Sequence, residues 1–180
     1  MDKGKTCCFL GHREIEKSNE LLKAIKDYIE MLIVKENVKI FLFGSKSEFD
    51  SLCHSIVTEL KEKYPFLKRI AYTCRSELAV LECDREHCEI LFKGIAEINA
   101  VEEEFEYKTK YVSGKASYVE RNQAMIDNSE YCIFYYNEKY LPPRRPRNGG
   151  LGVYQPKSGT EIAYKYAERK KKKIKNFFMS

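Results

Sequence analysis

The stretch Cys7-Cys8-Phe9-Leu10-Gly11-His12-Arg13 is an apolar run that ends in a small-residue turn. Near the other end of the chain, a second turn, Lys157-Ser158-Gly159-Thr160, opens a run with helical spacing over 161–167. A strand, a small-residue turn and a helix in succession direct backbone N–H groups and the helix dipole at an anion, usually a phosphate. Two such turns in one short chain predict a nucleotide site.

Apolar blocks alternate with helically spaced stretches along the rest of the chain. We expect strands at about 6–10, 38–43, 68–73, 131–136 and 173–178, and helices at about 17–34, 48–63, 84–98, 118–128 and from 159 onward. This alternation predicts an α/β fold with an open, mostly parallel Rossmann-like sheet and helices on both faces. Ligands of such sheets bind beyond the carboxyl ends of the strands, where Gly11, Gly44 and Thr73 fall.

Length and composition indicate one globular domain over residues 1–180. The chain is 43% hydrophobic and 33% charged, values typical of globular rather than disordered proteins. No apolar stretch approaches the roughly 18 residues that a membrane span requires, and residues 1–5 carry no cleavable signal pattern. We therefore expect a cytoplasmic protein that does not contact a membrane.

The cysteines do not predict a metal site. The chain has seven, an odd number, and Cys7, Cys8, Cys53 and Cys132 lie in apolar contexts where a thiol behaves as a small hydrophobe. A zinc site built from Cys74, Cys83, His87 and Cys88 would lack the Cys-x-x-Cys pair of common zinc sites. We expect neither a metal nor a cofactor.

Two basic segments stand out in a chain whose net charge is +5. The run 169–173 with Lys175 is interpreted as a solvated helix end, in preference to a nucleic-acid patch. The segment 137–157 is rich in proline and glycine, carries three arginines, and is expected to be an irregular loop. A lid over the phosphate and an unstructured insertion both remain open for this loop.

The motifs resemble a known group of proteins. Phe9-Leu10-Gly11-His12-Arg13, then Phe43-Gly44-Ser45 and Phe49-Asp50, resemble the opening of the YpsA-like proteins. These belong to the SLOG superfamily, a Rossmann-like group that also holds the LOG phosphoribohydrolases and the DNA-processing protein DprA. Residues 121–129 resemble that group's Arg-Asn-x-x-Met-x-Asp-x-Ser segment, and Ser158-Gly159-Thr160 with Ala163 and Ala167 is similar to its Gly-Gly-Thr turn and helix. The matches keep the family's order and span nearly the whole chain.

The resemblance implies a nucleotide-binding domain with an altered catalytic centre. In LOG enzymes an arginine and a glutamate cleave the N-glycosidic bond of a nucleoside monophosphate; the arginine matches Arg121, and the glutamate follows the Gly-Thr pair by three residues. Ala163 stands at the glutamate position here. Glu161 lies two residues earlier, which on a helix is roughly 160° away. Ser158 replaces a glycine of the family turn, and the chain lacks tryptophan.

The expected ligand-binding residues come from the turns and the two motifs. They are Gly11, His12, Arg13, Gly44, Ser45, Asp50, Arg121, Asn122, Ser158, Gly159 and Thr160. Arg13 and Arg121 are expected to pair with phosphate. His12 either orients a phosphate or caps a turn, and a lone histidine is more often structural. Asp50 either braces the loop after the second strand or holds a ribose hydroxyl. Arg121 and Glu161 are the catalytic candidates. Met125 is expected in the core, and Asp127, at a helix end unfavourable for an anion, should have a specific partner.

Three functions follow from these features. The first is a module that binds or senses a nucleotide or a nucleotide-derived ligand without turnover. The second is a hydrolase of an N-glycosidic or phosphoester bond, with Glu161, Glu120 or Glu14 as the general base. The third is single-stranded nucleic-acid binding, as in DprA, through the basic tail and the tyrosines. The sequence favours the first, and it leaves a homodimer open.

Overall fold

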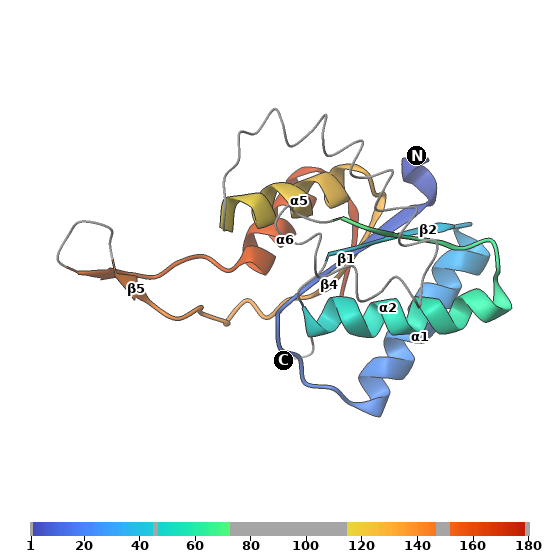
Figure 1. Ribbon diagram of the computed structural model, residues 1–180, viewed down its shortest axis with the longest axis horizontal. Coiled ribbons are helices and arrows are strands. Elements are labelled where there is room, and N and C mark those ends of the chain that lie inside the picture. The colour runs from blue at the N-terminus through green and yellow to red at the C-terminus, as the bar shows by residue number, and fades with distance from the viewer. Residues whose placement is uncertain (1, 45–46, 73–114, 147–151, 179–180) are drawn as a thin grey trace.

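The computed structural model describes residues 2–44, 47–72, 115–146 and 152–178. Five parallel strands form one sheet: β1 (Thr6–Gly11), β2 (Ile40–Phe43), β3 (Lys68–Ala71), β4 (Tyr131–Tyr135) and β7 (Lys173–Asn176). Their order in the sheet is β3-β2-β1-β4-β7. A short 3-10 helix at Lys3–Lys5 precedes β1. The predicted open, parallel α/β sheet is confirmed (Figure 1).

Two helices cover one face of the sheet. Helices α1 (Asn19–Lys35) and α2 (Glu48–Lys63) lie below the strands in Figure 1. They bury the side chains at every second position of β1, Cys7 and Phe9, together with Ile25 and Phe49. The Phe9 ring stacks on the ring of Phe43, with 5.0 Å between centroids. Because strand side chains alternate between faces, the other half of β1 packs on the opposite side.

Helices α5 (Lys115–Asp127) and α6 (Gly159–Arg169) cover that opposite face (Figure 1). They enclose Cys8, Leu10 and Phe134 with the expected core residue Met125, which is fully buried. The side chain of Asp127 accepts a hydrogen bond from the Tyr166 hydroxyl at 2.8 Å and pairs with Lys170 at 3.1 Å. Asp127 thus has the specific partner that its position required, and it joins the two helices.

Most predicted elements occur within two residues of their expected bounds, and the predicted bounds of α2 match. The expected helix at 84–98 and the residues considered for zinc, Cys74, Cys83, His87 and Cys88, lie outside the described residues. Among the described residues no group of histidine, cysteine and acidic side chains is arranged to hold a metal ion. No helix in the described ranges is long and apolar enough to cross a bilayer.

The expectation of an irregular loop over 137–157 is wrong in part. Strands β5 (Arg145–Pro146) and β6 (Val153–Tyr154) pair antiparallel within it and form a ribbon. Figure 1 shows this arm reaching out from the domain, away from the layers of the sheet and helices. Proline does not prevent the pairing because both strands of a two-stranded ribbon are edge strands, where a missing N–H is tolerated.

The basic tail makes contacts within the domain. Lys173 lies 3.1 Å from the Tyr131 hydroxyl, and Lys175 lies 5.4 Å from the centre of the Phe177 ring. Arg169 stacks over the Tyr166 ring at 5.6 Å. These cations belong to the end of α6 and to β7, the edge strand. The side chains of Arg169, Lys173 and Lys175 remain exposed, as expected for a solvated helix end and edge strand.

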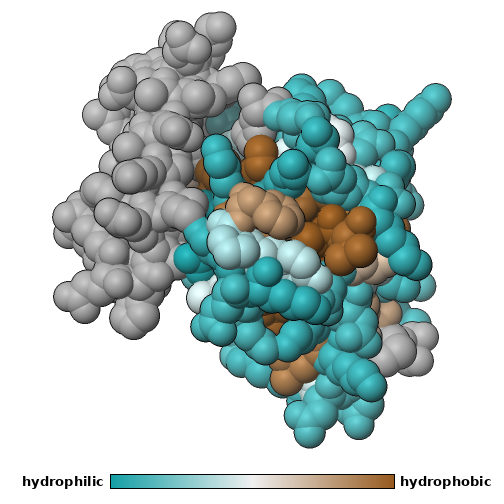
Figure 2. Space-filling view, turned by 90° about the vertical axis from the view of Figure 1, so that its right-hand side faces the viewer, coloured by the Kyte–Doolittle hydropathy of each residue, from teal (hydrophilic) through white to brown (hydrophobic). Residues whose placement is uncertain are grey.

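The end of the molecule opposite the arm is mostly polar. Figure 2 shows this end, where apolar side chains reach the surface in patches between hydrophilic ones. Among the described residues outside the arm, the two most exposed large apolar residues are Val34, in the last turn of α1, and Phe66, just before β3. Lys39 covers the Phe66 ring at 5.7 Å.

Candidate functional site

The predicted ligand residues gather at the carboxyl edge of the sheet, on three neighbouring segments. Gly11 ends β1, Gly44 follows β2, and Ser158 precedes α6. Strands β1 and β2 are adjacent in the sheet, and α6 packs on the face that Leu10 and Phe134 line. Ser45 lies outside the described residues.

Gly11 is required by packing. A Cβ atom at this position would lie 2.5 Å from the Cβ of Phe49, closer than two carbon atoms approach. Helix α2 therefore sits directly against the end of β1. This contact accounts for the glycine without a ligand.

The first predicted phosphate turn does not lead into a helix. Seven residues separate Gly11 from α1, whose N-terminus is capped by the Ser18 hydroxyl through Leu21 N–H at 3.1 Å. The residues between them are tied to α2 instead. Glu48 N–H donates to the Arg13 carbonyl at 2.9 Å, and the Glu48 carboxylate accepts from Ile15 N–H at 3.1 Å.

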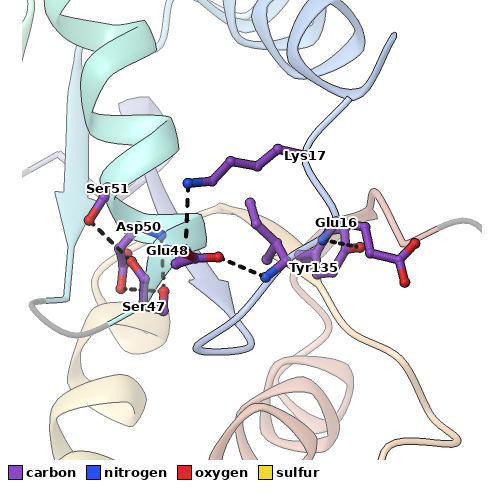
Figure 3. A network of polar contacts seen from close by, with 8 residues as sticks. Glu16, Lys17, Ser47, Glu48, Asp50, Ser51 and Tyr135 are labelled. Atoms are coloured by element: carbon purple, nitrogen blue, oxygen red, sulfur yellow. Dashed lines mark hydrogen bonds and ion pairs between the residues drawn. The ribbon is translucent and has the colours of Figure 1, made fainter. Parts of the chain in front are cut away.

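Figure 3 shows this network, in which Glu48 also pairs with Lys17 at 3.7 Å. Glu16 N–H donates to the Tyr135 hydroxyl at 3.3 Å, which ties the same turn to the end of β4. The Arg13 side chain is exposed. The turn after β1 is thus held by protein groups on both sides, and it does not form the expected cradle of N–H groups with a helix behind it.

His12 is buried beside β4 and acts as a hydrogen-bond acceptor. Its Nε2 accepts the Asn137 N–H at 2.9 Å, so this nitrogen carries no proton in the contact. Burial lowers the pKa of His12 below its ordinary value. The ring lies 4.6 Å from Tyr140 and 6.0 Å from Tyr136. His12 therefore anchors the start of segment 137–157, and it supplies no positive charge for a phosphate.

Asp50 braces the loop after β2. Its carboxylate accepts the Gly44 N–H at 3.2 Å and the Ser47 hydroxyl at 3.2 Å, while its own N–H donates to that hydroxyl at 2.9 Å. Ser47 is the N-cap of α2, so the pair closes the first turn of the helix. Asp50 is buried. Of the two roles considered for it, these bonds support the bracing role.

Arg121 reaches this loop from α5 on the opposite face. A Cβ on Gly44 would lie 3.0 Å from both Arg121 Nη2 and Asp50 Oδ2, so a guanidinium and a carboxylate converge on the glycine. Arg121 Nη2 also donates to Asn122 Oδ1 at 3.2 Å, and its Cζ lies 5.1 Å from the centre of the Tyr118 ring. The guanidinium is therefore oriented by several groups, and Asn122 acts by positioning it.

The second predicted phosphate turn does open a helix. Ser158 is the N-cap of α6, and its hydroxyl accepts the Glu161 N–H at 2.9 Å. Gly159 and Thr160 follow as the first two helical residues. The position of a Cβ on Gly159 meets no atom within 4 Å, so the backbone there faces open space. An anion can approach the N-terminus of α6 at this point.

The candidate carboxylate Glu161 lacks the environment of a general base that works near neutral pH. Glu161 pairs with Lys165 at 2.8 Å, and this hydrogen bond lowers the pKa of the carboxyl. Such a base requires the opposite shift. Ala163 is buried against Phe134 in the core between α6 and the sheet, and it brings no polar atom to the edge. The arrangement can bind an anion, but the described residues supply no raised-pKa carboxyl beside it.

Sequence reasoning missed two aromatic residues at this edge. Tyr118 lies under the Arg121 guanidinium, three positions before it on the same helix face, a spacing that could have predicted the contact. Tyr136 lies between His12 and Tyr164, the latter at 4.8 Å, and so links the first turn to α6. That link depends on tertiary structure, and no local signal indicates it.

Comparison with known proteins shows the fold. No protein-family model and no curated protein matches the sequence. DNA processing protein A (DprA) from Streptococcus pneumoniae superposes with a TM-score of 0.53 at 13% identity, covering 97% of this chain and 50% of that one. DprA from Helicobacter pylori, whose structure was described for its single-stranded DNA binding mode, superposes with a TM-score of 0.52 at 14% identity. That superposition covers 97% of this chain and 66% of the Helicobacter protein. The chain thus spans half to two thirds of these proteins, and it shares the Rossmann-like α/β sheet found in them.

Proposed function

We propose that this chain binds a phosphate-bearing nucleotide at the carboxyl edge of its sheet and does not hydrolyse it, as a YpsA-like relative within the SLOG superfamily. The observation that carries the proposal is that this edge holds an oriented guanidinium, Arg121 beside Gly44, and the open N-terminus of α6 at Gly159. A guanidinium and helix N–H groups are the two groups that recur in phosphate sites.

The state of the carboxylates supports binding without turnover. Departure of a base from ribose builds positive charge that a nearby carboxylate stabilises, and protonation of the base requires an acid. The family glutamate is replaced by Ala163, and Glu161 is held by Lys165 with a lowered pKa. Incubation with AMP should release free base more slowly than about 0.1 per second, well below typical enzyme rates. Faster release that Glu161→Gln abolishes would establish the hydrolase function instead.

Calorimetric titration with AMP and ATP tests the binding site. Arg121→Ala should weaken the affinity by about 1.5–3 kcal/mol, the scale of a lost charged hydrogen bond. Arg169→Ala, at the far end of α6, removes the same charge and should leave the affinity unchanged. Circular dichroism shows whether each variant is folded. A folded Arg121→Ala with wild-type affinity would limit Arg121 to positioning the loop at Gly44.

A second candidate function is the binding of single-stranded nucleic acid. The observation that favours it is the similarity of the fold to DprA, one of whose structures was described for single-stranded DNA binding. In the tail named in the sequence-based hypothesis, Lys170 pairs with Asp127 and Lys173 contacts the Tyr131 hydroxyl. A strand bound to the tail would compete with these contacts. An oligonucleotide that binds at least about tenfold more tightly than a mononucleotide, through contacts to several phosphates, would favour this function.

A further inference from the structure

One of the two basic segments of the chain is the one that holds the β5–β6 ribbon. Between Glu138 and Glu161 there is no acidic residue. The basic residues of this interval are Lys139, Arg144, Arg145, Arg147 and Lys157. The remainder of the chain has 27 basic and 27 acidic residues, and its own basic segment is the tail 169–175. A uniformly basic segment that extends from the domain is an electrostatic pattern of a site for a polyanion.

The ribbon places basic and aromatic side chains together. Arg145 lies directly opposite Tyr154 in the antiparallel register, and Pro146 lies opposite Val153. Directly opposed residues project from the same face of a ribbon. One face therefore presents Arg145 with Tyr154, a cation beside an aromatic ring. Tyr154 is 43% exposed, and Arg144 and Arg145 are exposed as well.

The base of the arm is held against the carboxyl edge. On the outgoing leg the Tyr140 ring packs at 4.6 Å on the buried His12, which also accepts the Asn137 N–H. On the returning leg the Gln155 side-chain amide donates to the Pro142 carbonyl and so joins the two legs. The arm then enters the N-cap of α6 at Ser158. Both legs of the arm therefore join the domain at the same edge as the candidate phosphate site.

We propose that the described part of the arm, residues 139–146 and 152–157 with the β5–β6 ribbon, binds a single strand of nucleic acid. Arg144 and Arg145 contact successive phosphates, and the Tyr154 ring stacks on a base. A single strand fits because its bases are free to stack on an exposed ring, whereas those of a duplex are already stacked. The inference rests on the second candidate function above, and it does not need the nucleotide site to be occupied.

Charge favours a nucleic acid over a second copy of the chain as the occupant. A strand offers one negative charge per nucleotide along its whole length. A second copy carries a net charge of +5, and even outside its arm it has equal numbers of basic and acidic residues, so it offers no net negative charge to attract the arm. The apolar side chains on the arm, Leu141 and Val153, are compatible with contact to bases.

Fluorescence anisotropy with a labelled 20-nucleotide oligothymidylate, measured over a range of salt concentrations, tests the proposal. The double variant Arg144→Ala with Arg145→Ala should bind about tenfold or more weakly. Its slope of log affinity against log salt should fall by about 1.4, since each phosphate contact to a single strand contributes about 0.7. Lys23→Ala with Lys35→Ala removes two exposed cations from α1 and should change neither quantity.

A second pair of variants tests the stacking. Tyr154→Ala should weaken binding about fivefold or more, while Tyr154→Phe, which keeps the ring, should bind like the wild type. The same loss for a duplex of equal length would overturn the preference for a single strand. An unchanged affinity and salt slope in the folded double arginine variant would overturn the proposal itself.

Two further measurements separate the alternatives. Titration of the arm variants with AMP should give wild-type affinity, so loss of oligonucleotide binding with AMP binding intact assigns the loss to the arm. If AMP fails to bind the wild type while the arm variants still lose the oligonucleotide, the nucleotide site fails and the arm inference stands. Sedimentation velocity measures whether two copies of the chain associate. If the arm variants dissociate a dimer and keep their affinity for the oligonucleotide, the arm serves contact between copies instead.

Discussion

Gly11 ends β1 and Gly44 follows β2 at the carboxyl edge, yet they are glycines for different reasons. At Gly11 a side chain would collide with the buried ring of Phe49. At Gly44 it would press on two polar groups, the guanidinium of Arg121 and the carboxylate of Asp50. The first position serves packing, and the second leaves room for the charged groups that approach β2. Only the second position is connected with the candidate site.

Gly11→Ala should lower the free energy of unfolding by about 1–3 kcal/mol, the usual cost of overpacking. The added methyl group would lie 2.5 Å from the Cβ of Phe49, and both atoms sit on ordered backbone. Urea denaturation measures the change. Gly159→Ala is the matched control, because its methyl group would meet no atom within 4 Å, and its stability should equal or slightly exceed that of the wild type. Equal stability of the two variants would contradict the collision.

His12 should make the stability of the fold depend on pH between about 7 and 5. Because burial lowers the pKa of His12, the unfolded chain binds a proton at this residue where the folded chain does not. The free energy of unfolding therefore falls as pH drops through the ordinary pKa of about 6.5, and it levels off below the lowered pKa. Denaturation midpoints from pH 7.5 to 5 measure this fall.

His12→Gln supplies the control for the pH dependence. Glutamine keeps an acceptor for the Asn137 N–H and does not titrate. The variant should lose less stability over this range than the wild type. The lowered pKa values of Glu30 and Glu161 act only near and below their ordinary value of 4.5, so they leave this interval unaffected. Identical pH profiles for the two proteins would show that His12 does not titrate as described.

At the scale of elements, α6 carries out two tasks with its two ends. Its N-terminus presents Gly159 to open space at the candidate site. Its last turns hold α5 through Tyr166 and Lys170, both of which contact Asp127. The polar bridge fixes the relative position of the two helices that bring Arg121 and Gly159 to the carboxyl edge. The end of α6 thus supports the site without contacting a ligand.

Tyr166→Phe should lower the free energy of unfolding by about 1 kcal/mol, because it removes the hydrogen bond to the Asp127 carboxylate and leaves the ring in place. Tyr164→Phe, on the same helix with its ring against Phe134, is the matched control and should change the stability by less. Thermal and urea denaturation measure both variants. The prediction fails if the two substitutions have equal effects.

At the scale of the whole molecule, the layered domain provides the buried core and the arm provides exposed basic side chains. The described part of the sheet and its helices form a layered domain with cores on both faces. The arm adds net charge and exposed side chains, and β5 and β6 contribute no buried residue to either core. An element with this character is expected to affect binding more than stability.

Shortening the arm tests this division. Replacing residues 143–154 by Asn-Gly joins Pro142 to Gln155, which are already in contact, through a tight turn. The free energy of unfolding should change by less than about 0.5 kcal/mol, as for surface changes away from the core. Oligothymidylate affinity should fall at least as far as in the double arginine variant. A large loss of stability by urea denaturation would show that the arm is part of the fold.

Local pattern was sufficient to predict much of the fold. The continuous apolar run of β1, typical of a strand buried on both faces, and the helical spacing in α2 are features of short stretches of sequence. The burial of Met125 and the capping position of Ser158 follow from the same local rules. The placement of the ligand candidates at one edge follows from parallel topology, because the strands of a parallel sheet share a carboxyl end.

What the tertiary structure decided are the partners. Phe49 leaves no room for a side chain at Gly11, Tyr166 donates a hydrogen bond to Asp127, and Asn137 donates one to His12. Each of these contacts joins residues that are far apart in the chain. The sequence by itself determined the elements, their order and the small-residue turns, since these depend on neighbours along the backbone. Which turn opens onto solvent, and which cations are already occupied, depended on long-range packing, because a side chain's environment is created only when distant segments meet.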